Sequence, residues 1–98
     1  MNIRKTMEGN KLAVALEGRL DTTTAPALEE ELWGALTGIQ EIDFDFSALE
    51  YISSAGLRVL LSAQKKLAGD GRVVIRNANE LVMEVFEVTG FVDILTIE

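Results

Sequence analysis

The chain has 98 residues, 48% hydrophobic and 26% charged, a balance typical of one folded domain and unlike that of a disordered segment. It contains no cysteine and no histidine, which excludes disulfides, thiolate metal sites and the catalytic dyads and triads that need an imidazole. Sixteen acidic against nine basic residues give a net charge of -7, and a surface this acidic repels the phosphate backbone of a nucleic acid.

No targeting or membrane-spanning pattern is found in the sequence. The basic residues Arg4 and Lys5 are not followed by the apolar run of a signal peptide. No stretch reaches the roughly 18 apolar residues that a membrane helix needs. We therefore expect a soluble, cytoplasmic protein that forms a single domain over residues 1–98, acts as a monomer, and holds no metal or cofactor.

The first forty residues predict a hairpin followed by a helix. Residues 3–7 and 11–18 are strand-like runs joined by a glycine-containing turn, and the second run alternates apolar with smaller or polar side chains. The threonines at 22–24 are N-cap candidates, and Pro26 fits the first turn of a helix. We expect this helix to end at Gly38.

The rest of the chain alternates strands with helices. We expect strands at 42–46, 72–76 and 93–97, and a loop at 47–53. One helix is expected at 54–68, where Gly69-Asp70-Gly71 ends it. Another is expected to begin after an Asn79 cap and to end at Thr89, before Gly90. The resulting order, ββαβαβαβ, predicts an α/β fold. Its sheet is mainly parallel and five-stranded, with the first strand antiparallel, and the three helices pack mostly on one face.

The strand at 42–46 has one apolar and one acidic side. Ile42, Phe44 and Phe46 alternate with Asp43 and Asp45, so the two carboxylates share a face of the sheet. No neighbouring motif suggests catalysis or metal binding there. We expect a solvated sheet face, with Asp45 able to hold the loop that follows.

The helix at 54–68 presents Ser54 to solvent. At 100° per residue its buried stripe holds Leu57, Leu60, Leu61, Gln64, Leu67 and Ala68. Arg58 lies beside Ser54 on the opposite side. Ser53 projects toward the core, which suits an N-cap. Of the two serines, Ser54 is therefore the one that a partner could reach.

A phosphate group on Ser54 would lie where a helix favours an anion, at the free N–H groups and the positive end of the dipole. Arg58, one turn further along, could pair with it. Phosphorylation would add about -1.5 to -2 charges without melting the helix. A serine pair before a helix is also an ordinary cap, and spacing alone favours that interpretation. Asp21 similarly either opens the turn into the first helix or contacts a partner.

Two motifs resemble those of a known family. Asp45-Phe46-Ser47 and the run Tyr51-Ile52-Ser53-Ser54-Ala55-Gly56-Leu57-Arg58-Val59-Leu60-Leu61 are similar to the signature of the STAS family, the anti-sigma factor antagonists of bacteria. Gly18-Arg19-Leu20-Asp21, before the threonine-rich helix start, resembles the family's second marker. The resemblance covers nearly the whole chain, and the expected element order also agrees with the family.

The resemblance implies a switch between binding partners. The unphosphorylated domain would bind an anti-sigma factor with a histidine-kinase-like ATPase fold, which also acts as its serine kinase, and a metal-dependent serine phosphatase would remove the phosphate. The family's acceptor corresponds to Ser54. Ser53 replaces the usual aspartate and is the second candidate. The expected partner-binding residues are Asp21, Thr22, Thr23, Tyr51, Ser53, Ser54, Ala55, Gly56 and Arg58.

Two other functions remain open. STAS domains also occur outside sigma-factor control, so this one could be a scaffold subunit that is not switched by phosphate, in a lipid-transport or stress-signalling complex. An enzyme or small-ligand carrier is the third possibility, but a serine nucleophile needs a base within reach. The spacing of the sequence supplies none.

Overall fold

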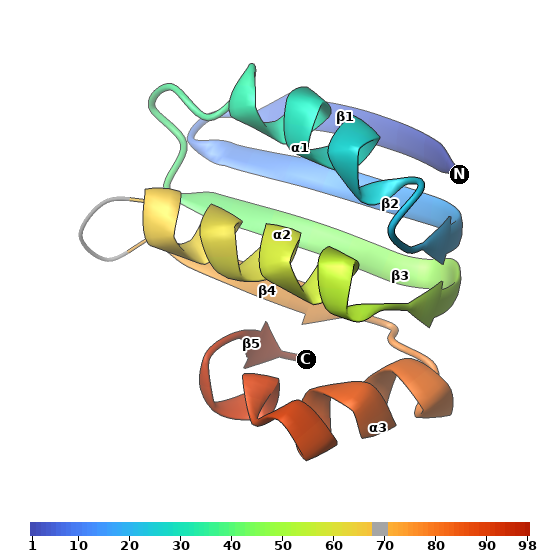
Figure 1. Ribbon diagram of the computed structural model, residues 1–98. Helices are drawn as coiled ribbons and strands as arrows, with labels where there is room; N and C mark the ends of the chain where they lie inside the picture. The colour runs from blue at the N-terminus through green and yellow to red at the C-terminus, as the bar shows by residue number, and fades with distance from the viewer. Residues whose placement is uncertain (68–70) are drawn as a thin grey trace.

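The computed structural model describes residues 1–67 and 71–98 as a five-stranded sheet covered by helices (Figure 1). The strands are β1 (Asn2–Glu8), β2 (Lys11–Leu20), β3 (Glu41–Ile52), β4 (Arg72–Arg76) and β5 (Thr96–Ile97). The helices are α1 (Ala25–Trp33), α2 (Ser54–Lys66) and α3 (Glu80–Thr89), with a short 3₁₀ turn, η1, at Phe91–Asp93. The predicted order of strands and helices is confirmed.

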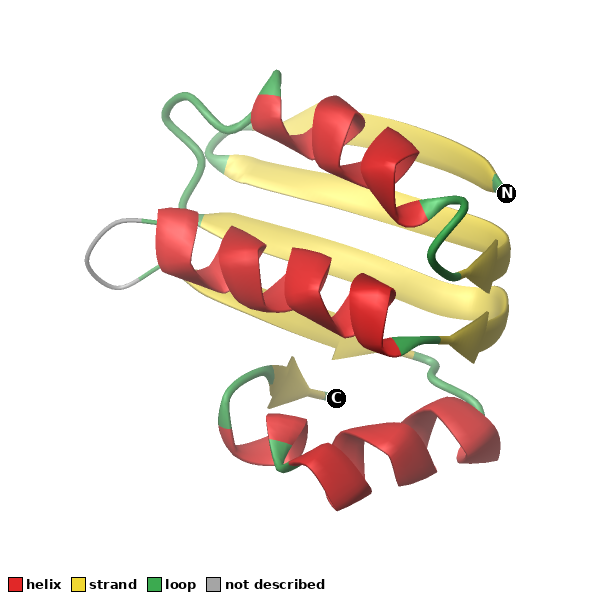
Figure 2. Cartoon of the chain, viewed as in Figure 1, coloured by secondary structure: helices red, strands yellow, loops and turns green. Residues whose placement is uncertain are grey.

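The strands lie in the order β1-β2-β3-β4-β5, so neighbours in the chain are neighbours in the sheet. β1 is antiparallel to β2, and every later pair is parallel. Figure 2 shows α1, α2 and α3 on the same side of the sheet, as right-handed crossovers between adjacent strands require. The predicted fold class is therefore confirmed. None of the described helices is long and apolar enough to cross a bilayer.

The core lies between the sheet and the helices. Leu12, Val14 and Leu16 of β2 are almost fully buried and alternate with more exposed residues, as their period of two predicts. Phe46 of β3 stacks on Phe86 of α3, with ring centroids 6.4 Å apart. This aromatic contact fixes α3 against the middle of the sheet.

The first helix begins where predicted but ends earlier, and its N-cap side chain makes a different contact. α1 ends at Trp33 with Gly34 as its C-cap, four residues before Gly38. Thr24 occupies the N-cap position, but its hydroxyl accepts no helix N–H. That hydroxyl instead donates to the carbonyl of Arg19 at 2.8 Å, so it fastens the turn to the end of β2.

The loop predicted at 47–53 is wrong, because β3 continues to Ile52. β3 pairs with β2 along this whole length, but the register shifts twice, between Ala15 and Glu17 and between Gly18 and Arg19. At each shift β3 uses one more residue than β2, which is the geometry of a bulge. The extra residues break the alternation of buried and exposed side chains. Residues 47–52 therefore lack the period of two by which a strand is recognised in a sequence.

The C-terminal part of the chain follows the prediction until the last strand. α3 begins at an Asn79 cap whose side chain accepts the Val82 N–H at 2.8 Å, and it ends at Gly90 with φ of 80°. The strand predicted at 93–97 is shorter in the structure: η1 ends at Asp93, a turn follows at 94–95, and the extended part is limited to Thr96–Ile97. The predicted helix end at 68 and the glycine break that follows fall largely on residues 68–70, outside the described residues.

The sheet face away from the helices carries a salt-bridge network. Asp43 accepts from the Nε of Arg76 with both carboxylate oxygens at 3.0 Å, and Lys11 lies 3.5 Å away. The expected solvated carboxylate is therefore wrong for Asp43, which is only 9% exposed because its partners cover it. Asp45 accepts the Ser47 N–H at 2.9 Å and so holds the next segment, as predicted.

Candidate functional site

The ends of β2 and β3 bring the two sequence motifs together. Leu20 pairs with Ile52 in the parallel register, and the Ser53 N–H donates to the Leu20 carbonyl at 2.9 Å. Asp21 and Ser53 therefore follow directly from adjacent strands at the carboxyl edge of the sheet, where α/β folds place their sites (Figure 1).

The two serines have different environments. Ser53 is the N-cap of α2: it is half-buried, and its hydroxyl accepts the Gly56 N–H at 3.5 Å. Ser54 is the first residue of α2 and is exposed, as is Arg58 one turn along. The environments predicted for the two serines, a capping Ser53 and an exposed Ser54, are confirmed. The buried face of α2 is shifted from the predicted stripe, because Val59 and Ala63 are buried while Leu61 and Gln64 are only half-buried. Ala68 lies outside the described residues.

Gly56 sets how closely α2 approaches the strands. A Cβ at this position would lie 2.7 Å from Leu20 Cγ and 2.9 Å from Ile52 Cγ1, distances that real side chains do not tolerate. The lack of a side chain therefore lets the first turn of α2 lie against the ends of β2 and β3. Gly56 is buried and Ala55 is half-buried, so these two of the predicted partner-binding residues position Ser54 more than they offer side chains to a partner.

Asp21 is the structural centre of the neighbouring turn. Its Oδ1 accepts the N–H groups of Thr23 at 3.0 Å and Thr24 at 3.2 Å. The hydrogen bond from the Thr24 N–H is the main cause that lowers the pKa of Asp21 below its ordinary value, so the carboxylate stays charged. The turn-forming interpretation of Asp21 is thus confirmed. Thr22 and Thr23 are exposed beside it and remain open to a partner.

Arg19 is a site residue that the sequence analysis did not select. Its guanidinium lies over the Tyr51 ring, 4.4 Å from the centroid, and its Nε is 3.9 Å from Asp21 Oδ2. Arg19 and Tyr51 are paired in the register of β2 and β3, so the contact follows from strand pairing. The contact could not be predicted because Tyr51 was expected in a loop at 47–53, which has no pairing partner in β2.

The first turn of α2 favours an anion at Ser54. The first turn of α2 contains no acidic side chain, so nothing within that turn offsets the positive end of the helix dipole. Arg58 lies four residues after Ser54, at the spacing where helical neighbours face each other. Within the described part of the chain, the Ser54 hydroxyl has no side-chain hydrogen bond. The site can therefore accept a phosphate without displacing a structural contact.

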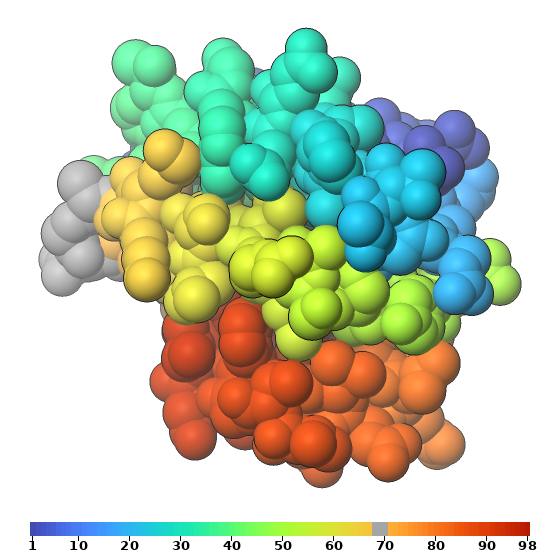
Figure 3. All heavy atoms as spheres, in the orientation of Figure 1, coloured from blue at the N-terminus to red at the C-terminus, as the bar shows by residue number. Residues whose placement is uncertain are grey.

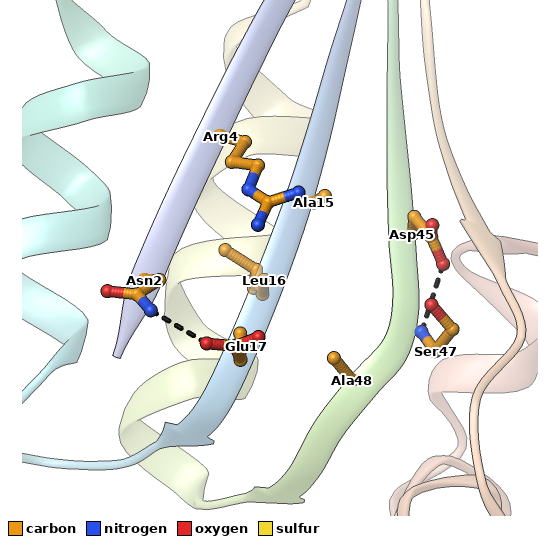
Figure 4. Close-up of a pocket in the computed structure, with 8 residues that line it drawn as sticks. All are labelled: Asn2, Arg4, Ala15, Leu16, Glu17, Asp45, Ser47 and Ala48. Carbon is orange, nitrogen blue, oxygen red and sulfur yellow. Dashed lines mark hydrogen bonds between the residues drawn. The ribbon is translucent and has the colours of Figure 1, made fainter.

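A shallow pocket lies elsewhere, on the sheet face away from the helices (Figure 4). Its volume is about 120 Å³, and it lies beside the bulged part of β2 and β3. The residues that line it are Asn2, Arg4, Ala15, Leu16, Glu17, Asp45, Ser47 and Ala48. Ser54 is not among them, so this hollow supplies no enclosed substrate site for a Ser54 nucleophile.

Comparison with known proteins identifies the family. Residues 3–96 match the sequence model of the family described as "Mlab, STAS domain". The chain belongs to the STAS domain family. A candidate anti-sigma factor antagonist of Bordetella bronchiseptica, BtrV, is 38% identical over 88 residues, which are 88% of this chain and 76% of that protein. The anti-sigma-B factor antagonist of Staphylococcus aureus is 29% identical over 97 residues, 97% of this chain and 90% of that protein.

Solved structures agree on the STAS fold. The Bacillus cell-fate determinant SpoIIAA in its phosphorylated form has a TM-score of 0.77 and 20% identity, covering 99% of this chain and 91% of that chain. SpoIIAA in its unphosphorylated form, an anti-sigma factor antagonist, has a TM-score of 0.78 and 19% identity, covering 99% and 87%. At this level of identity the likeness is one of fold.

Proposed function

We propose that residues 1–98 form a single STAS domain that acts as an anti-sigma factor antagonist. It binds an anti-sigma factor and thereby controls transcription, and it is a cytoplasmic, monomeric binding protein without catalytic activity of its own. The names of its relatives in Bordetella and Staphylococcus support this function. The structure adds a polar, exposed site at the carboxyl edge of the sheet.

Phosphate on Ser54 is the proposed control. The observation that carries it is the exposed Ser54 at the start of a helix whose first turn has no acidic residue, beside a capping Ser53 that already has a structural role. SpoIIAA, which shares the fold, exists in phosphorylated and unphosphorylated forms. A phosphate here changes the surface while the cap and the Gly56 contacts stay in place.

The partner surface extends from the turn at Asp21 to Arg58. Thr22, Thr23 and Ser54 are exposed, and the Arg19–Tyr51 pair lies at the strand ends beneath them. A dianion in the middle of this surface must be desolvated and confronts any acidic group of the partner. A loss of about 3 kcal/mol weakens binding about a hundredfold, which is sufficient for a switch.

The enzymes of the cycle are part of the same proposal. The anti-sigma factor would have a histidine-kinase-like ATPase fold and transfer the γ-phosphate of ATP to the Ser54 hydroxyl. A metal-dependent serine phosphatase would restore the free hydroxyl. In this proposal the two partners supply the catalytic groups, and this chain supplies the Ser54 hydroxyl.

The test is to locate the phosphate. The chain is incubated with ATP and an anti-sigma factor that it co-purifies with, and its phosphopeptides are sequenced by mass spectrometry. We expect phosphate on Ser54 in the wild type and in Ser53→Ala, and none in Ser54→Ala. Phosphate on Ser53 alone would contradict the assignment of the acceptor.

A second candidate is a STAS scaffold that is not switched by phosphate, in a lipid-transport or stress-signalling complex. Two observations favour it: the matched family model carries the name Mlab, and Ser53 stands where the resemblance leads us to expect aspartate. Reproducible absence of phosphate on both serines, with stable binding in the presence of ATP, would support the scaffold over the switch.

A further inference from the structure

α3 has two apolar sides, and the core uses one of them. Val82 and Phe86 are fully buried against the sheet. Leu81, Val85 and Val88 form a second stripe at the spacing of a helix face, and Leu81 is 50% and Val88 80% exposed. A helix that is apolar on more than its core face is usually covered by something else.

The outer stripe belongs to an open, mainly apolar surface. This surface is formed by Leu81, Glu84, Val85, Val88 and Thr89, all from α3. Figure 3 shows α3, in orange and red, along one rim of the molecule, and α1 forms the opposite rim with α2 between them. This α3 surface is therefore separate from the turn at Asp21, which precedes α1.

The charge carried by α3 itself is of one sign. The helix contains Glu80, Glu84 and Glu87 and no lysine or arginine. Glu84 lies beside the apolar residues of the stripe. Glu87 lies in the last turn of α3, where the helix dipole disfavours an anion and no basic residue compensates. A cation brought to this surface would relieve that repulsion.

We propose that the outer face of α3 is a second docking surface, which binds a basic amphipathic helix of a partner protein. The apolar side of that helix covers Leu81, Val85 and Val88, and its lysines or arginines pair with Glu84 and Glu87. An anionic membrane fits poorly, because the carboxylates repel it. A second copy of the chain would bring another row of carboxylates against the first. Docking here goes beyond the proposed antagonist function and does not depend on Ser54.

The probe is a synthetic helix of about five turns with leucine on one face and lysine on the other. It is titrated into isotope-labelled wild-type chain at low salt while the amide NMR spectrum is recorded. We expect the shifts to be confined to residues 80–90. The Leu81→Ser/Val88→Ser variant, which changes no charge and alters exposed side chains, should bind at least about tenfold more weakly.

Matched variants separate this site from general charge attraction. Glu84→Gln/Glu87→Gln should weaken binding about fivefold or more at low salt, and high salt should reduce the difference. Glu29→Gln/Glu30→Gln removes the same charge from exposed positions of α1 and should leave the affinity unchanged. The proposal would be overturned if Glu29→Gln/Glu30→Gln lost as much affinity as Glu84→Gln/Glu87→Gln, or if the chemical shift changes spread over α1. So would sedimentation that shows a dimer of the free chain lost in Leu81→Ser/Val88→Ser.

Discussion

The starts of α1 and α2 lie beside each other at the carboxyl edge of the sheet, but they differ in the negative charge that they hold. Before α1, the Asp21 carboxylate already accepts the N–H groups of Thr23 and Thr24. Before α2, a neutral serine hydroxyl accepts one N–H, and the first turn has no acidic residue. The turn before α1 already holds a carboxylate, and the start of α2 holds none.

This difference supports the proposed phosphorylation at the start of α2. Both starts are near threonine or serine hydroxyls, but the Thr24 hydroxyl donates to Arg19 and is tied into the turn. Ser54 has the exposed position and the uncompensated helix dipole. The proposed acceptor, Ser54, therefore differs from Thr24 in its electrostatic surroundings as well as in its exposure.

The largest expected effect on stability comes from filling the space at Gly56. Gly56→Val places side-chain carbon against Leu20 and Ile52, at distances below 3 Å before relaxation. We expect the free energy of unfolding to fall by about 1–3 kcal/mol, as in other overpacked sites. Urea denaturation measures the change.

Gly34→Ala is the matched control. A Cβ at Gly34 would meet the Glu30 carbonyl oxygen at 3.7 Å, an ordinary contact, and the backbone φ there is -74°. Its stability should be equal to the wild type or up to about 1 kcal/mol higher. If Gly56→Val were as stable as Gly34→Ala, the close approach of α2 to the strand ends would not be required.

A smaller effect should distinguish the two helix starts directly. Ser54→Asp puts a carboxylate at the free positive end of α2 and should raise the free energy of unfolding by about 0.3–1 kcal/mol at low salt. Ala27→Asp, an exposed position in the first turn of α1, should give less, because Asp21 already occupies that end. Thermal unfolding at low and high salt measures both. A larger gain in the free energy of unfolding for Ala27→Asp than for Ser54→Asp would contradict the difference between the two helix starts.

The smallest effect concerns the charge of Asp21. Hydrogen bonds from Thr24 and Thr23 lower its pKa in the folded state below the ordinary 3.8, so the folded chain binds the proton less readily than the unfolded chain. The carboxylate therefore contributes stability above the ordinary pKa, and this contribution is lost as the pH falls through the lowered value. Relative to Asp21→Asn, the wild type should be more stable at neutral pH, and the difference should disappear in acid. A difference that is constant with pH would contradict this role.

Most of the fold could be predicted because its signals are local. The alternation in β2, the Asn79 cap and the Gly90 stop each depend on a few adjacent residues. The second half of β3 could not be predicted, because its two register shifts are a property of its pairing with β2. The last strand was predicted three residues too long at its start, because the turn that follows η1 takes up residues that look extended in the sequence.

The site was predictable where one helix defines it. A helical wheel separates Ser54 from Ser53 without knowledge of the rest of the chain, and the structure has the same division. The contacts of Arg19 with Tyr51 and of Asp43 with Arg76 join separate strands, so they needed the register. The exposure of Leu81 and Val88 on α3 was not predicted, because apolar residues on a helix are ordinarily assigned to the core.

The binding of Ser54→Asp to the cognate anti-sigma factor, followed by titration calorimetry, tests the account most directly. Ser62→Asp, which adds the same charge at an exposed position two turns along α2, serves as the control. We predict at least a roughly hundredfold loss of affinity for Ser54→Asp, with a melting temperature no lower than the wild type, and at most about a threefold loss for Ser62→Asp. Wild-type affinity in Ser54→Asp would contradict a switch at this residue.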